Sequence, residues 1–225
     1  MPSHHLVFDV NETLLDLSPL DAVFADLFGA VSTRRTWFAS MLHWSTVTTL
    51  TGEYQDFGVL AGHCLDALAE QQRRPISADD RQRVFDTIAT LAPHPDVVPA
   101  LDRLGENGFT LVALTNSAQK TVDAQFAHAG LTDHFAHVLS VDRARCCKPH
   151  PKAYGVAADA LGCKLAELRL IAAHDWDVTG ALRAGCQAAF VAREGAVLNR
   201  AGKRPDVIGR DLADVAEQLI ALDGQ

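Results

Sequence analysis

The hydrophobic pattern divides the chain into two kinds of segment. Residues 4–10 (HHLVFDV) contain a short apolar run that ends at an acid, and this pattern predicts a buried strand. From about residue 17 to residue 92, apolar residues instead recur at three- and four-residue spacing, which is typical of amphipathic helices. Pro93 and Pro95 then punctuate the chain.

Beyond the two prolines, short apolar runs alternate with helical patterns. The runs FTLVALTN, HVLSVD, LRLIAA, QAAFVA and DVIG predict strands. Strands that alternate with helices predict an α/β fold, a doubly wound parallel sheet. We therefore expect a core domain made of residues 1–16 and 93–225. The helical block, residues 17–92, would be a cap domain inserted after the first strand, above the sheet edge where such folds bind ligands.

Composition and charge limit the possible partners. The chain has 225 residues, is 48% hydrophobic and carries a net charge of −8, so a nucleic acid or an anionic membrane is not expected to bind it. No apolar run is long enough to span a membrane, and the segment before Asp9 is too short for a secretory signal. Five cysteines without a CxxC pair are typical of reduced cytoplasmic thiols. The sequence leaves a homodimer open.

Polar residues follow four of the predicted strands. Any one of these groups alone is typical of a turn or a helix cap. Four groups at the same edge of one sheet favour an active site, because that edge is where doubly wound sheets bind ligands. The groups are Asp9, Thr115-Asn116-Ser117, Lys148 and His174-Asp175-Trp176-Asp177.

These residues resemble the motifs of the haloacid dehalogenase-like hydrolases. The matching stretches are FDVNETLLD, LTNS, the lysine of CCKPHP and AAHDWDVTGA, and the resemblance covers essentially the whole chain. It implies that Asp9 is a nucleophile and that Thr115 holds the reacting anion. It also implies that Lys148 neutralises charge on the nucleophile and that Asp177 is a further catalytic acid.

Two positions separate this chain from the phosphatases of that superfamily. The phosphatases carry a general acid two residues after the nucleophile, where this chain has Asn11, which has no proton to give. They also carry an acid early in the fourth motif that completes a Mg²⁺ site, and here that position is Ala173. A halide leaves without a proton, and a lysine with neutral donors can hold the nucleophile without metal. The chain therefore resembles the L-2-haloacid dehalogenase branch, and we expect no cofactor.

The resemblance implies a covalent mechanism. Asp9 would attack the halogen-bearing carbon of a small, anionic (S)-2-haloacid and form an aspartyl ester while halide leaves. Water activated by Asp177 would then hydrolyse the ester and release a 2-hydroxy acid.

Several expected substrate contacts depart from the branch. Its tyrosine at Asn11 and its serine at Ala172 are absent, and its motif-four asparagine is His174. The position of its cap arginine aligns with Gly29, so Arg34 or Arg35 is the candidate replacement, although either arginine alone is typical of a solvated helix charge.

We interpret Glu12 as a turn residue. The predicted substrate-contacting set is Asn11, Asn116, Tyr154, His174 and Trp176, with Arg34 and Arg35.

Two other functions remain as alternatives. One is a Mg²⁺-dependent phosphatase for a small phosphate ester in which Asp175 has become a metal ligand. The other is a binding protein that keeps the fold without turnover. Asn11 and Ala173 argue against the first, and the retention of the four catalytic candidates argues against the second.

Overall fold

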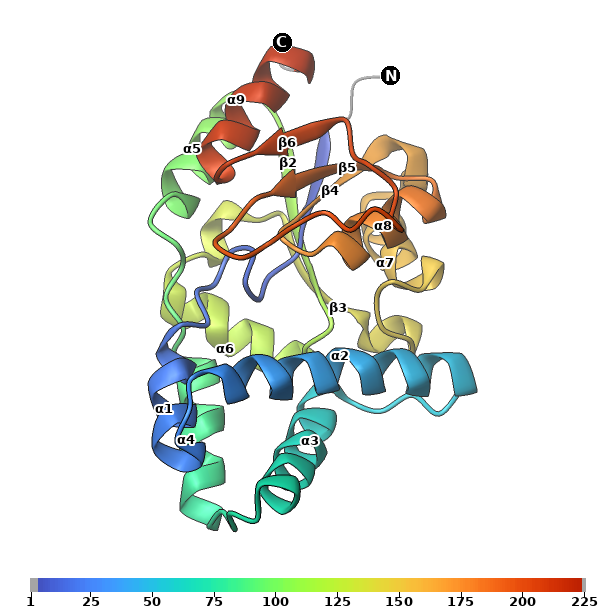
Figure 1. Ribbon diagram of the computed structural model, residues 1–225. Coiled ribbons are helices and arrows are strands. Elements are labelled where there is room, and N and C mark those ends of the chain that lie inside the picture. The colour runs from blue at the N-terminus through green and yellow to red at the C-terminus, as the bar shows by residue number, and fades with distance from the viewer. Residues whose placement is uncertain (1–3, 224–225) are drawn as a thin grey trace.

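A computed structural model describes residues 4–223 and contains one six-stranded parallel sheet (Figure 1). Its strand order, β3-β2-β1-β4-β5-β6, places β1 in the middle between β2 and β4. This architecture confirms the predicted doubly wound α/β fold. The strands are β1 (His5–Phe8), β2 (Thr110–Thr115), β3 (His137–Ser140), β4 (Leu168–Ala172), β5 (Gln187–Val191) and β6 (Val207–Gly209).

Helices cover both faces of the sheet, and the central strand is buried on both. Leu6 and Phe8 of β1 pack into one apolar cluster, and Val7, which points to the opposite face, packs into the other. Figure 1 shows α5 and α9 to the left of the sheet and α7 and α8 to the right. The helices are α5 (Val97–Glu106), α6 (Gln119–Ala129), α7 (Pro151–Leu161), α8 (Asp175–Ala184) and α9 (Leu212–Asp223), with 3₁₀ turns at Thr132–His134, Val141–Ala144 and Leu165–Glu167.

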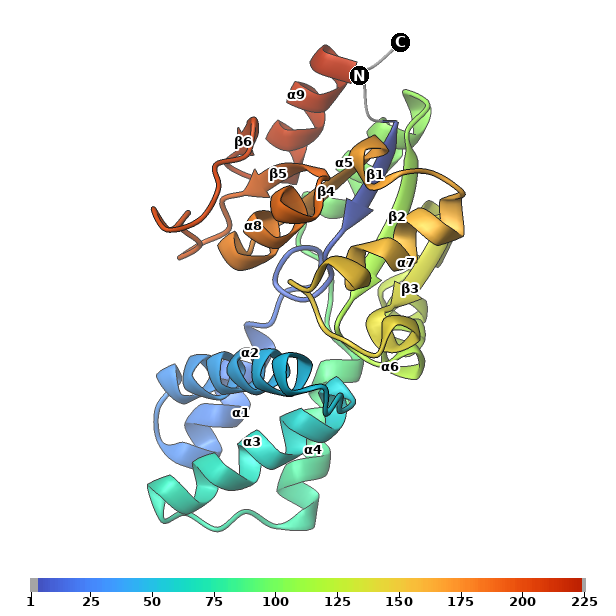
Figure 2. The same ribbon diagram turned by 90° about the vertical axis from the view of Figure 1, so that its right-hand side faces the viewer.

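The block between β1 and α5 folds into four helices, which we call the four-helix insertion. Gly29 and Gly52 end its first two helices in the left-handed conformation, with φ of 83° and 77°, which glycine adopts without strain. Figures 1 and 2 show the insertion beyond the carboxyl ends of the strands. Its helices are α1 (Pro19–Phe28), α2 (Ser32–Thr51), α3 (Phe57–Gln72) and α4 (Ala78–Ala89).

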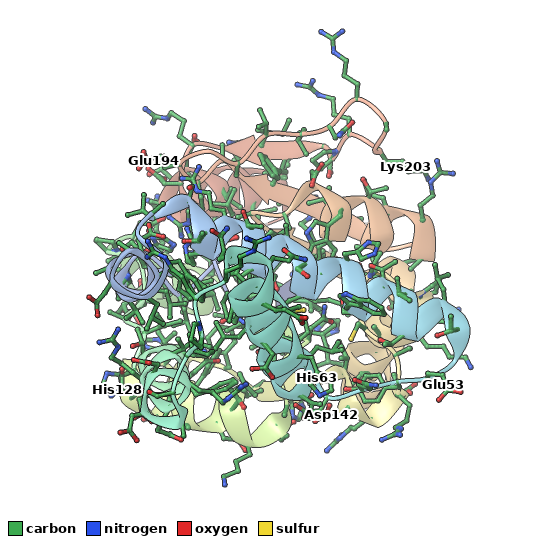
Figure 3. All side chains as sticks on the ribbon, turned by 60° about the horizontal axis from the view of Figure 1, so that its bottom comes forward. Glu53, His63, His128, Asp142, Glu194 and Lys203 are labelled. Atoms are coloured by element: carbon green, nitrogen blue, oxygen red, sulfur yellow. The ribbon has the colours of Figure 1, made fainter. Side chains whose placement is uncertain are left out.

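Both ends of α2 are tied to the sheet domain. Near its start, Arg34 forms an ion pair with Glu12, which lies in the loop after β1. Beyond its end, Tyr54 donates a hydrogen bond to Asp142, which is labelled in Figure 3. The two tethers hold the insertion over the sheet edge that carries the predicted site. In the part of the chain that is described, no helix has both the length and the apolar character needed to cross a membrane.

Candidate active site

Asp9 directly follows the central strand, and its backbone N–H still bonds to the carbonyl of Ile171 at 3.0 Å. Its side chain is 8% exposed. Oδ1 accepts a hydrogen bond from Lys148 Nζ at 2.8 Å, and Oδ2 lies 2.7 Å from Thr13 Oγ1 and 2.9 Å from His174 Nδ1. Burial raises the pKa of Asp9, but Lys148 and His174 outweigh burial and hold the pKa far below its ordinary value. Asp9 is therefore an ionised carboxylate in a nearly dry site.

Lys148 is the cation at the centre of the site. Its side chain is 1% exposed, and Nζ donates to Asp9 Oδ1, to Asp177 Oδ2 at 2.7 Å and to the carbonyl of Leu114 at 2.9 Å. Burial lowers the pKa of Lys148, but the two carboxylates raise it by more than burial lowers it. The pKa therefore lies above its ordinary value, and the amine stays charged. Asn116 fixes the loop that carries the lysine, because its Oδ1 accepts the backbone N–H of Lys148 at 2.9 Å.

Asp177 lies in the first turn of α8, where the helix dipole favours a carboxylate. It is fully buried, with Oδ2 bonded to Lys148 and Oδ1 accepting from the Tyr154 hydroxyl at 2.7 Å. Burial, together with the charge of Asp9, raises its pKa, and Lys148 opposes that rise. Asp177 is thus a stronger base than an ordinary aspartate, and a shared lysine holds it beside Asp9.

A second chain of charges leads from Asp9 to the four-helix insertion. The His174 ring bonds to Asp9 through Nδ1 and lies 3.0 Å from Glu12 Oε2 through Nε2. Glu12 Oε1 is paired with Arg34 Nη1 at 2.8 Å, and Arg34 Nε is paired with Asp21 at 2.6 Å. Burial lowers the pKa of His174, but its two carboxylate partners raise it to about 10, so the ring is an imidazolium at neutral pH.

A small cavity lies between the insertion and the sheet edge. Its volume is about 60 Å³, and its walls are apolar, with Trp37, Phe38 and Met41 of α2 among them. Asn11 and Ser117 are among its few polar lining residues, and they are hydrogen-bonded to each other at 3.2 Å. The cavity has the size and the lining for a small molecule with an apolar part and a polar end, and Asp9 is not among its lining residues.

The structure brings several of the predicted side chains into one hydrogen-bonded group. Hydrogen bonds form an unbroken network through Asp9, Lys148, Asp177, Tyr154 and His174. Tyr154 contacts Asp177, so its direct contact with substrate stays a prediction. The indole Nε1 of the neighbouring Trp176 is buried and, within residues 4–223, has no hydrogen-bond partner.

Other predicted residues make contacts that the sequence did not specify. Asn116 uses its amide on the Lys148 backbone, and Thr115 Oγ1 accepts the backbone N–H of Ser117 at 3.1 Å, so neither side chain faces the cavity lining. Their contact with the reacting anion stays a prediction. Of the two arginines, Arg34 is buried and paired to the site, whereas Arg35 is exposed on α2.

Three residues of the site were given no individual role by the sequence. Thr13 holds Asp9 and in turn accepts the backbone N–H of Ala173 at 2.9 Å. Ser117 lines the cavity, and Glu12, which we interpreted as a turn residue, pairs with His174. Thr13 and Ser117 lie within the motif stretches FDVNETLLD and LTNS, so the motifs themselves contain the signal for them.

The phosphatase alternative depends on Asp175 as a metal ligand. Asp175 Oδ1 accepts the backbone N–H of the next residue, Trp176, at 2.8 Å in the first turn of α8. Among the residues that the structure describes, no group of three or more histidine, cysteine or acidic side chains could hold a metal ion. The position of a second motif-four carboxylate is Ala173, which offers no ligand.

The fold and the site define an α/β protein with a buried, ionised aspartate at the end of its central strand. The family model for haloacid dehalogenase-like hydrolases matches residues 4–185. An (S)-2-haloacid dehalogenase of Xanthobacter autotrophicus is 34% identical over 194 residues, which cover 84% of this chain and 74% of the relative. Haloacetate dehalogenase H-2 of Moraxella sp. is 29% identical over 203 residues, 89% of this chain and 91% of that protein.

Solved structures agree with the sequence relatives. The structure of the L-2-haloacid dehalogenase of Xanthobacter autotrophicus with chloropropionic acid covalently bound superposes with a TM-score of 0.89. It is 26% identical, and the match covers 97% of this chain and 98% of that one. The chain therefore belongs to the haloacid dehalogenase-like hydrolases, which confirms the resemblance drawn from its motifs.

Proposed function

We propose that this protein hydrolyses a small (S)-2-haloacid to a 2-hydroxy acid through an ester of Asp9. The observation that carries this proposal is the surroundings of Asp9. The carboxylate is buried and ionised, its partners are Lys148, His174 and Thr13, and the residue two places on is the neutral Asn11. A nucleophile with no general acid two residues after it suits a leaving group that needs no proton.

In the first half-reaction, an Asp9 oxygen attacks the carbon that bears the halogen, and the carbon–halogen bonding pair leaves with the halide. Lys148 keeps Asp9 ionised until the attack. The relative with covalently bound chloropropionic acid supports an intermediate of this kind. The Asn11 amide and the Ser117 hydroxyl at the cavity wall are the neutral donors for the substrate carboxylate or the halide.

In the second half-reaction, water adds to the Cγ atom of the ester. Asp177 takes the proton of that water, because burial raises its pKa and makes it a stronger base than an ordinary aspartate. The bond between Cγ and the ester oxygen then breaks, and the alkoxide takes the proton as the 2-hydroxy acid. Tyr154 keeps Asp177 oriented through its hydroxyl.

The cavity supports a small substrate. An engineered protein cavity of about 150 Å³ binds benzene, and a cavity of about 60 Å³ is less than half that volume. Its apolar walls suit a halogen and a methyl group better than a phosphate. We therefore expect haloacids of two or three carbons, such as chloroacetate and (S)-2-chloropropionate, to be the best substrates.

We further propose that the reaction needs no metal. Lys148 and the His174 imidazolium already contact the two oxygens of Asp9, so the nucleophile has cationic partners on both sides. The four-helix insertion, residues 17–92, would act as the cap that closes over a core made of residues 1–16 and 93–225. The five free thiols support a cytoplasmic location. Nucleic acid and membranes are not expected partners, and a homodimer remains open.

A substrate panel tests the proposal. Purified protein is mixed with (S)- and (R)-2-chloropropionate, chloroacetate and several small phosphate esters, and halide and phosphate are measured. We expect halide release from the S enantiomer and from chloroacetate. Phosphate release with no halide from any 2-haloacid would contradict the proposal and favour the phosphatase.

A further inference from the structure

Glu12 adopts a backbone conformation that glutamate rarely takes. Its φ is 61°, in the left-handed region, where glycine is the residue without steric penalty. Non-glycine residues in this region cluster at functional sites, where surrounding contacts hold them. At Glu12 those contacts are made by the carboxylate, which accepts from His174 through one oxygen and from Arg34 through the other.

The geometry of the His174 ring fixes its protonation state. Its two nitrogens lie 2.9 Å and 3.0 Å from carboxylate oxygens of Asp9 and Glu12. A carboxylate has no proton to donate, so each ring nitrogen must carry one, and only the imidazolium carries both. Phe38 stacks on the ring with centroids 5.9 Å apart, and the Trp176 ring lies 5.2 Å away. Two aromatic rings beside a cation favour the charged form.

The two oxygens of Asp9 are not equivalent. Oδ2 has two donors, Thr13 and His174, whereas Oδ1 has one, Lys148. Each carboxylate oxygen has about two lone pairs, so Oδ1 keeps one that is free to attack. Once Oδ1 has become the ester oxygen, Oδ2 is the ester carbonyl oxygen, and both of its donors are already in place.

We propose that His174, held as an imidazolium between Asp9 and Glu12, stabilises the negative charge that develops on Asp9 Oδ2 during ester hydrolysis. Glu12 is its positioning residue, and Arg34 joins the pair to the four-helix insertion. The inference rests on the proposed function, because it assumes the Asp9 ester. Water adds to Cγ, the carbonyl pair moves to Oδ2, and Asp177 receives the water proton. Collapse returns that pair to the carbonyl and breaks the Cγ–O bond, and the leaving alkoxide takes the proton from Asp177 to become the 2-hydroxy acid.

The charged groups around His174 agree with this assignment. Asp9 from the end of β1 and Glu12 from the following loop face the ring directly. Behind them lie Lys148 on Asp9 and Arg34 of α2 on Glu12. Esterification removes the charge of Asp9, and Glu12 is then the carboxylate that keeps the ring protonated. The role of Glu12 is therefore greatest in the hydrolysis step.

The test compares Glu12→Gln and Glu12→Gly with a matched control, Asp21→Asn. Glu12→Gln keeps the size of the side chain, whereas Glu12→Gly removes the side chain and relieves the strain of the left-handed backbone. A folding defect common to both variants is therefore not expected. Asp21→Asn removes the other partner of Arg34 but leaves Glu12 and His174 paired. Rapid mixing with excess (S)-2-chloropropionate separates the burst of halide from the slower hydrolysis, and intact mass follows the ester.

We expect both Glu12 variants to slow hydrolysis by about tenfold or more, while the halide burst persists and the ester accumulates. Loss of an oxyanion donor costs about 10²–10³-fold, and these variants keep His174 but remove its positioning. The alkaline limb of the hydrolysis rate should move down by about one to three pH units, because a lost opposite charge lowers the pKa of the histidine by that much. Asp21→Asn should keep both the hydrolysis rate and the pH position of its alkaline limb. In a His174→Asn background, Glu12→Gln should have no further effect.

Two failures are distinguishable. If the unaltered protein releases no halide from any 2-haloacid, the proposed function fails. If it does release halide and both Glu12 variants keep its hydrolysis rate and alkaline limb, only the role of Glu12 and His174 is overturned. An equal effect of Glu12→Gln with and without His174 would also overturn it, since the glutamate would then act through another group.

Discussion

Lys148 Nζ lies 2.8 Å from Asp9 Oδ1 and 2.7 Å from Asp177 Oδ2, and one buried ammonium thus joins two carboxylates that come from different motifs. The charge of Asp9 is one of the causes that raise the pKa of Asp177. When Asp9 becomes a neutral ester, that cause disappears and Lys148 is left with Asp177 alone. Asp177 is therefore ionised at the step in which it must accept a proton.

Replacing Asp9 by asparagine should abolish turnover of every 2-haloacid, because an amide is a poor nucleophile and Lys148 then has only Asp177 as a carboxylate partner. Halide release is measured on freshly purified protein, since deamidation would restore the aspartate. Full activity with asparagine confirmed at position 9 by mass spectrometry would contradict a covalent role for Asp9.

Asp177→Asn should separate the two half-reactions. The variant keeps the nucleophile but lacks the base, so we expect one equivalent of halide to be released and an adduct to accumulate on the peptide that contains Asp9. Intact-mass and peptide measurements after mixing with substrate detect the adduct. Normal turnover by the variant would show that another group activates the water.

Excess EDTA should leave halide release unchanged within about twofold, because Lys148 and His174 supply the positive charge that superfamily phosphatases obtain from Mg²⁺. Hydrolysis of small phosphate esters should be negligible with or without added Mg²⁺, since Asn11 has no proton for a leaving alkoxide. Strong stimulation of halide release by Mg²⁺ after EDTA treatment would contradict a metal-independent site.

The site also predicts how stability depends on pH. The pKa of His174 is raised from 6.5 to about 10 by its carboxylate partners. The folded protein therefore holds this proton up to about pH 10, whereas the unfolded chain loses it near pH 6.5. The protonated His174 makes its full contribution to the free energy of unfolding below pH 6.5. That contribution falls by about 1.4 kcal/mol per pH unit as the pH rises toward 10. The stability difference between the unaltered protein and His174→Asn should shrink over this range in urea titrations.

The positions of Asp9, Lys148 and Asp177 could be predicted because strand periodicity locates strand ends. In a parallel sheet all carboxyl ends meet at one edge, so residues 139 positions apart become neighbours without any knowledge of loop structure. The alternation of strand and helix was enough for the fold class. Within the helical block, α1 ends at Gly29 and α2 ends at Gly52, so these two glycines divide the block into separate helices.

Side-chain partners across loops could not be predicted in the same way. Glu12 reads locally as a turn residue, and it does adopt a turn conformation, but its carboxylate meets His174, which is 162 residues away. Asn116 likewise follows a strand as expected and then uses its amide on the Lys148 backbone. Neither pairing leaves a periodic signal, because each depends on how two loops approach each other at the sheet edge.

The origin of the product oxygen tests the nucleophilic role of Asp9 most directly. The protein, in molar excess over (S)-2-chloropropionate, completes a single turnover in water enriched in ¹⁸O, and mass spectrometry follows both the lactate and the peptide that contains Asp9. Our account predicts an unlabelled new hydroxyl in the lactate, because that oxygen comes from Asp9, and one ¹⁸O atom in the Asp9 carboxylate. Labelled lactate from the first turnover, with unlabelled Asp9, would show direct displacement by water and contradict the account.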